Sequence, residues 1–85
     1  MYANSINQFI GVTYKKLIER QCLDPYGSIY FALDDVKESC TSDSRCKAVA
    51  SVMDWGCEEG YYQLCFTNQF TNQSNACVYE KIGKL

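Results

Sequence analysis

The chain has 85 residues, six cysteines, no histidine and a formal net charge of −2. A domain this short buries only about 60 to 65% of its unfolded surface, so its apolar core alone gives marginal stability. The weak net charge and the dispersed basic residues disfavour nucleic acid, heparin and anionic membranes as partners. We therefore expect one domain over residues 1–85, with its core at 9–82, that depends on covalent bracing.

The first half of the chain is predicted to contain one ambiguous segment, a turn and a helix. Residues 9–22 fit either an apolar helical stripe or a bent strand. The sequence LDPYG at 23–27 has the residues of a tight turn. From Leu33 the apolar residues recur at helical spacing while the charged residues face away, which predicts a helix that ends at the polar residues 41–44.

The second half is predicted to be β-structure. KAVASVM at 47–53 and YYQLCFT at 61–67 read as partner strands around a glycine-flanked loop, and ACVYEKI at 76–82 reads as a last strand. It follows the polar loop TNQFTNQSN at 67–75. One helix among such strands indicates an α+β fold, a small disulfide-braced antiparallel sheet of four to five strands with one helix packed on one face.

The cysteine pattern favours disulfides over metal or redox sites. Structural zinc sites use closely paired cysteines, commonly completed by histidine, and redox pairs use Cys-x-x-Cys. The chain contains neither histidine nor a Cys-x-x-Cys pair. We therefore expect no metal, no cofactor and three disulfides among Cys22, Cys40, Cys46, Cys57, Cys65 and Cys77.

The order of these elements and cysteines resembles the PAN/apple domain family. The resemblance lies in LDDVKESCTSDSRCKAVASV at 33–52, YYQLCF at 61–66 and ACVYEK at 76–81. These stretches look like the family's helix, its two following cysteine positions, its cysteine-bearing strand and its final strand. The resemblance covers residues 22–81 and implies a PAN/apple-like fold. It also implies a role in adhesion or recognition, as in blood proteases, growth factors and parasite surface lectins.

The resemblance implies a disulfide between Cys40 and Cys46. In the family, a second bridge joins the helix one turn earlier to the position of Cys65, but this chain has Val36 there. An alternative arrangement therefore keeps a bridge from helix to sheet as Cys40 with Cys65, and pairs Cys46 with Cys57.

In the preferred arrangement, Cys65 pairs with Cys57 across the hairpin that joins their strands. Cys22 then pairs with Cys77, since the first and last strands are neighbours in the PAN fold. Six cysteines allow 15 connectivities, so the pairing depends on the resemblance rather than on the spacing alone.

Catalysis has little support in the sequence, and we expect no enzyme. Without histidine the usual general base is missing, and bridged cysteines leave no thiolate nucleophile. Acidic residues gather at Asp54, Glu58 and Glu59, in a glycine-flanked loop where such residues are usually solvated. No Asp-x-Asp-x-Asp-Gly pattern supports calcium binding there.

A binding surface is better supported, because aromatic residues make up 14% of the chain. Tyrosine and tryptophan combine an apolar face with a polar group, which suits both sugar stacking and protein contacts. Core packing is the competing role for each of them. The predicted contact surface consists of Asp54, Trp55, Glu58, Tyr61 and Tyr62.

The polar loop carries a second candidate feature. Asn72, followed by Gln73 and Ser74, is an N-glycosylation acceptor if the chain is secreted in a eukaryote. The amides of Asn68, Gln69, Asn72 and Gln73 are also suited to hydrogen-bonding a glycan. A glycan attached to Asn72 would argue against this loop as a binding face.

The sequence thus predicts a secreted, non-catalytic recognition module that binds an extracellular protein or glycan. Disulfides imply an oxidising compartment, and we expect Met1 to stand where a signal peptide was removed, because residues 1–11 lack the features of one. No apolar run approaches the roughly 18 residues needed for membrane insertion. The alternatives are a free-standing secreted signal, toxin or inhibitor, and a structural module that self-associates. The oligomeric state stays open.

Overall fold

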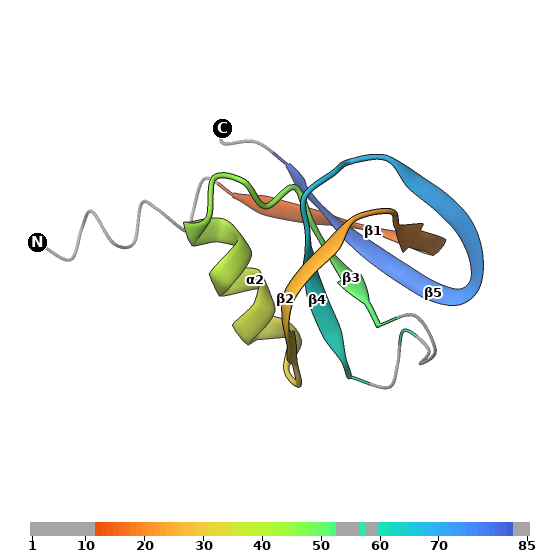
Figure 1. The fold of residues 1–85 in the computed structure, drawn as a ribbon, viewed down its shortest axis with the longest axis horizontal. Coiled ribbons are helices and arrows are strands. Elements are labelled where there is room, and N and C mark those ends of the chain that lie inside the picture. Colours follow the sequence, from red (N-terminus) through yellow and green to blue (C-terminus); the bar gives the residue numbers. More distant parts are fainter. Residues whose placement is uncertain (1–11, 53–56, 58–59, 83–85) are drawn as a thin grey trace, which may run out of the picture.

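The computed structural model describes residues 12–52, 57 and 60–82, which form one helix and a five-stranded antiparallel sheet (Figure 1). The strand order in the sheet is β1-β5-β3-β4-β2, so β1 and β2 lie at opposite edges. The predicted α+β class is confirmed. The elements are β1 (Thr13–Cys22), β2 (Pro25–Tyr30), α2 (Leu33–Ser42), β3 (Ala48–Ser51), β4 (Tyr62–Cys65) and β5 (Phe70–Ile82).

The first strand settles the ambiguity of residues 9–22. Their described part is a strand from Thr13 onward, paired with β5. The turn predicted at 23–27 is shorter than expected, because β2 already begins at Pro25 and pairs with β4. Proline suits this position, since an edge strand does not need every backbone N–H as a donor.

The strands of the second half are confirmed in order but not in extent. The strands predicted at 47–53 and 61–67 contain β3 and β4, which pair antiparallel. The last strand was predicted at 76–82, but β5 begins at Phe70 and includes most of the polar segment that we expected to be a loop. This segment pairs with the end of β1, and that contact supplies the strand conformation that its polar composition does not favour.

Helix α2 covers one face of the sheet through its apolar stripe. Val36 and Cys40 are fully buried and pack in one cluster with Val49 of β3 and Leu64 of β4. No side chain caps the helix at Ala32.

The C-terminal end of α2 receives a cation from another element. The Nζ atom of Lys81, in β5, donates to the carbonyl oxygens of Cys40 at 2.7 Å and Asp43 at 3.2 Å. A cation at a helix C-terminus compensates the helix dipole. The last turn of α2 has no basic residue of its own, so β5 supplies this charge and ties the helix to the sheet.

The second face of the sheet is partly covered by a bend in the β1–β5 pair. β1 and β2 are four inter-strand spacings apart, about 19 Å, but the link from Cys22 to Pro25 spans at most about 11 Å. β1 must therefore cross the sheet before β2 begins. The register of β1 and β5 shifts between Ile18 and Arg20, where Glu19 has a φ of 55°, and β5 curves there in Figure 1.

The crossing creates a second small core. Phe70, at the start of β5, packs against a buried cluster that contains Ala48, Ala50 and Val78, together with Cys22 and Cys65. The two faces of the sheet are thus filled differently. The helix covers one face, and the folded-over end of the β1–β5 pair covers part of the other.

All six cysteines are in disulfides, and one of the three predicted pairs is confirmed. Cys40 pairs with Cys46, with 5.2 Å between their Cα atoms. This also excludes the alternative in which those two cysteines pair with Cys65 and Cys57.

The other two predicted pairs are wrong. Cys22 pairs with Cys65, and Cys57 pairs with Cys77. The predicted Cys22–Cys77 bridge fails because Cys22 lies opposite Phe70, seven residues from Cys77 along β5. The predicted Cys57–Cys65 bridge fails because Cys65 is at the end of β4 that lies away from the β3–β4 loop, opposite Ala48.

We expect the three disulfides to differ in their contribution to stability. In the chain-entropy model, sequence separations of 43, 20 and 6 restrict the unfolded chain by about 4, 3 and 2 kcal/mol. Replacement of both cysteines by alanine should therefore lower the free energy of unfolding most for Cys22–Cys65 and least for Cys40–Cys46. Urea unfolding of the three double variants tests this order, and equal losses would contradict it.

Candidate functional site

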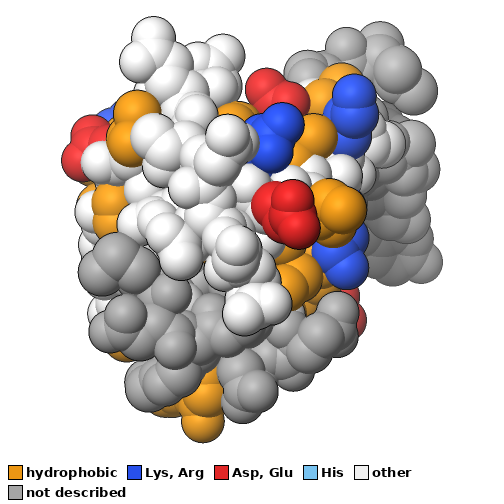
Figure 2. All heavy atoms as spheres, turned by 90° about the vertical axis from the view of Figure 1, so that its right-hand side faces the viewer, with side chains coloured by type: hydrophobic (Ala, Val, Ile, Leu, Met, Phe, Trp, Pro, Cys, Tyr) orange, Lys and Arg blue, Asp and Glu red, His pale blue; other side chains and the backbone are white. Residues whose placement is uncertain are grey.

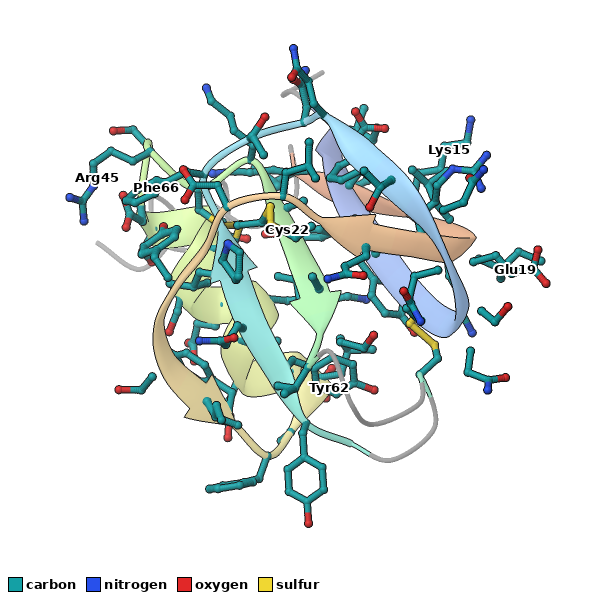
Figure 3. The ribbon with its side chains drawn as sticks, turned by 45° about the vertical axis from the view of Figure 1, so that its right-hand side comes forward. Lys15, Glu19, Cys22, Arg45, Tyr62 and Phe66 are labelled. Atoms are coloured by element: carbon teal, nitrogen blue, oxygen red, sulfur yellow. A yellow bond between two sulfur atoms is a disulfide. The ribbon has the colours of Figure 1, made fainter. Side chains whose placement is uncertain are left out.

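A cluster of aromatic and charged residues lies beside edge strand β2. The rings of Tyr26 and Phe66 stack in parallel, with centroids 3.5 Å apart and 4° between their planes. The guanidinium carbon of Arg45 lies 5.5 Å from the centroid of the Phe66 ring, within cation–π range. Figure 3 shows Arg45 and Phe66 side by side at one end of the molecule. With Asp43, these residues form what we call the Arg45 stack.

Asp43 holds the Arg45 stack together by accepting four hydrogen bonds. The Nε and Nη2 atoms of Arg45 donate to its two carboxylate oxygens, each at 3.1 Å, and the backbone N–H of Arg45 donates at 2.9 Å. The hydroxyl of Tyr26 donates to the same carboxylate at 3.1 Å. The Arg45 side chain remains 71% exposed, against 22% for Asp43. The guanidinium is thus fixed in position while still open to a partner.

The local sequence explains why these groups meet. The polar residues after α2 end the helix, and the disulfide between Cys40 and Cys46 closes them into a short loop. Within this loop, the N–H of Cys46 donates to the carbonyl of Asp43 at 3.0 Å. Phe66 follows β4 directly, and its N–H donates to the carbonyl of Asp24 at 3.2 Å, next to the start of β2.

A second aromatic contact lies past the other end of β2. The rings of Phe31 and Tyr61 meet edge to face, with centroids 5.4 Å apart and 85° between their planes. Phe31 is 73% exposed, and Ile29 nearby in the chain is 40% exposed. At about 3.3 Å per residue, Phe31 lies up to about 17 Å along the chain from Tyr26, just past the end of β2. Edge strand β2 therefore has aromatic groups at both ends.

The residues predicted as a contact surface divide into three groups. Tyr61 is half-buried in the contact with Phe31. Tyr62 is buried, packs edge to face on Tyr79 and donates its hydroxyl to the carbonyl of Cys57, so it is a core residue. The predicted residues Asp54, Trp55 and Glu58 lie outside the described residues.

The Arg45 stack was not predicted from the sequence. Neither Phe66 among the aromatic residues nor Arg45 among the dispersed basic residues stands out in the sequence. The spacing of Asp43 and Arg45 inside a loop closed by two cysteines was the available signal, because residues two apart in a tight turn can pair. Their contact with Tyr26 depends on strand β2, which was expected to be a turn.

Metal and membrane sites receive no support from the described part of the chain. No three ligating side chains gather there in a way that could hold a metal ion. In the same residues, no helix has the length and apolar composition required to cross a bilayer.

Comparisons with known proteins do not identify a family. No protein-family model matches the chain, and neither curated proteins nor solved structures include a match. The chemistry of the described surface is therefore the basis for a functional proposal.

The Asp43 carboxylate should stay ionised in acid. Hydrogen bonds from Arg45, with a weaker one from Tyr26, hold the pKa of Asp43 at about 2, below its usual 3.8. Because the folded pKa is lowered, the stabilising contribution is complete above pH 3.8 and is lost as the pH falls through about 2. The carboxyl ¹³C shift of Asp43 across this range tests the expectation. A midpoint near the usual value would show that the pairing with Arg45 is absent in solution.

The Tyr26 hydroxyl should be sensitive to the charge of Asp43. Burial, followed by the hydrogen bond to Asp43 and its negative charge, raises the pKa of Tyr26 from 10.0 to about 12. Its contribution to stability is present below pH 10 and is lost as the pH rises through about 12. Asp43→Asn should lower the pKa of Tyr26, as followed by the ring carbon shift of labelled tyrosine.

Proposed function

We propose that this chain is a secreted, non-catalytic recognition module of the PAN/apple type that binds an extracellular partner. The Arg45 stack is the observation that carries the proposal, and it favours a protein as the partner. Arginine and tyrosine are enriched among the residues that dominate protein interfaces. A partner that covers the stack would remove water from the Arg45 guanidinium, which Asp43 already holds in position.

Preorganisation is the physical reason why the Arg45 stack suits binding. Ordering a flexible arginine at an interface costs about 0.5 to 1.5 kcal/mol, and this cost is already met where Asp43 and Phe66 hold the side chain. A guanidinium has five N–H donors, and two of those of Arg45 are donated to the Asp43 carboxylate. The remaining donors suit a partner that presents a carboxylate or carbonyl oxygen beside an apolar side chain.

The β2 edge supports recognition by side chains rather than by addition of a strand. The register of β2 and β4 shifts between Tyr26 and Tyr30, around Gly27 with its φ of 80°. The amide of Gln63 donates to the carbonyl of Gly27 at 3.0 Å. An edge interrupted in this way is a poor template for another strand. Phe31 and Tyr61 would then add a second contact at the other end of β2.

Two further observations support the class of function. Three disulfides in a domain of this size are typical of extracellular proteins. No cysteine is free, so a thiolate nucleophile is not available, which supports a non-catalytic role.

Substitution of Arg45 tests the proposal. The immobilised domain would be screened against a panel of purified extracellular ectodomains, and each partner that binds would be titrated in solution. Arg45→Ala should weaken binding by about 10- to 100-fold, as expected for a central contact residue. Arg45→Lys should not restore it fully, because an ammonium cannot pair with the Asp43 carboxylate in the same two-point geometry.

The matched control is Lys15→Ala, because Lys15 is an exposed basic residue at the opposite end of the molecule (Figure 3). Its removal should change the affinity less than twofold. A partner that binds Arg45→Ala normally but loses Trp55→Ala would instead support the contact surface predicted from the sequence. A partner indifferent to both substitutions would contradict both surfaces.

The second candidate function is a free-standing secreted signal, toxin or inhibitor. The loop closed by Cys40 and Cys46 favours this possibility, because it presents Arg45 on a rigid frame. The full-length transcript separates the two functions. A recognition module is expected among other domains, whereas a signal or toxin is expected alone after a signal peptide.

A further inference from the structure

A polar hollow of about 580 Å³ lies at the bend of the β1–β5 pair, far from the Arg45 stack. It is lined by Glu19, Arg20, Asn72, Gln73 and Ser74, all of which are exposed. Figure 3 shows Glu19 at the opposite end of the molecule from Arg45. Figure 2 views the molecule from the bend side, where many of the described atoms belong to uncharged polar side chains or to the backbone. We propose that this hollow is a binding site for a neutral saccharide.

The chemistry of the lining side chains is the first argument. Each sugar hydroxyl both donates and accepts hydrogen bonds, so a saccharide site needs donors and acceptors close together. Here a carboxylate accepts, a guanidinium donates, and two amides and one hydroxyl do both. The one negative and one positive charge in the hollow cancel. This balance disfavours a polyanionic or polycationic ligand and suits a neutral one.

The backbone of the bend is the second argument. Glu19 has a φ of 55°, in the left-handed region that side chains larger than asparagine rarely adopt. Residues 73–76 of β5 bulge opposite this single residue, and Asn75 among them has a φ of 69°. Bulges of this kind redirect side chains at the rims of sheets. Glycine would adopt this conformation more easily than glutamate, and strained positions of this kind cluster at functional sites.

Arg20 is partly positioned before any ligand arrives. Its Nη1 atom donates to the carbonyl of Glu19 at 3.1 Å and lies 3.5 Å from the carbonyl of Ile18. Both contacts involve Nη1 alone, so they hold this nitrogen at the backbone of the bend. Ile18, which precedes Glu19 in the chain, is 67% exposed.

Asn72 lines the hollow and is also the predicted glycosylation acceptor, so saccharide binding in the hollow and glycosylation of Asn72 exclude each other. A glycan attached to Asn72 would fill the hollow and block a second saccharide. The binding experiment therefore uses protein produced in bacteria and folded with its disulfides. A companion measurement is the mass of the protein secreted from eukaryotic cells. Unmodified Asn72 supports the binding site, and a glycosylated Asn72 would overturn it.

The binding experiment is a titration of ¹⁵N-labelled protein with maltotriose, cellotriose and chitotriose as probes. We expect saturable shifts of the amides at 19–20 and 72–74 with at least one probe, at millimolar concentration. Arg20→Ala and Asn72→Ala should each weaken this binding at least fivefold. The matched control is Asn68→Ala, because the tetrapeptide FTNQ occurs twice and the copy at 66–69 does not line the hollow. Its affinity should be unchanged.

Substitutions of Glu19 separate a role in saccharide binding from a purely structural role. Glu19→Gly removes both the strained side chain and the carboxylate, so the urea midpoint should rise while saccharide binding is lost. Glu19→Gln retains an acceptor and should keep part of the binding. The proposal is overturned if no probe gives saturable shifts, if the shifts lie away from the bend, or if Glu19→Gly binds as the parent does. These results leave binding at Arg45 unaffected, so the two proposals fail separately.

Discussion

The short link between β1 and β2 is the constraint on which much of the structure depends. These strands lie at opposite edges of the sheet, but only two residues separate them in the chain. β1 must therefore bend and cross the second face, and the disulfide between Cys22 and Cys65 fixes the crossing on that face. The crossing explains the small core around Phe70, the strained backbone of Glu19 and the hollow beside it. A single topological requirement thus produces a core and a candidate site.

The opposite side of the molecule depends on the end of α2. The helix stops at a polar loop, which the bridge between Cys40 and Cys46 closes. Lys81 donates to the carbonyls at this end, so β5 secures the position of the loop relative to the sheet. Asp43 and Arg45 then form a paired charge that packs on Phe66. Hydrogen bonds to Asp43 and the contact with Phe66 hold the exposed Arg45 side chain, as a preorganised binding surface requires.

Features that depend on residues close together in the chain were predicted correctly from the sequence. The helix at Leu33–Ser42 and the pairing of β3 with β4 were predicted from periodicity and composition, because a helix and a hairpin form contacts between residues close in the chain. The Cys40–Cys46 bridge was also predicted, from the family resemblance. Tyr62 illustrates the limit. Its aromatic ring was consistent with a surface or a core position, and only its packing on Tyr79 decides for the core.

The sequence by itself determined the class of molecule: one amphipathic helix, short strands and enough cysteines to brace a core too small to stand alone. Tertiary structure decided which cysteines of the two longer bridges meet, because that depends on the register of β1 with β5 and on the crossing of the sheet. It also decided that the polar start of β5 is a strand and that Tyr26 reaches Asp43. Contacts between residues far apart in the chain leave no periodic signal in the sequence, and each candidate binding surface combines such contacts with local ones.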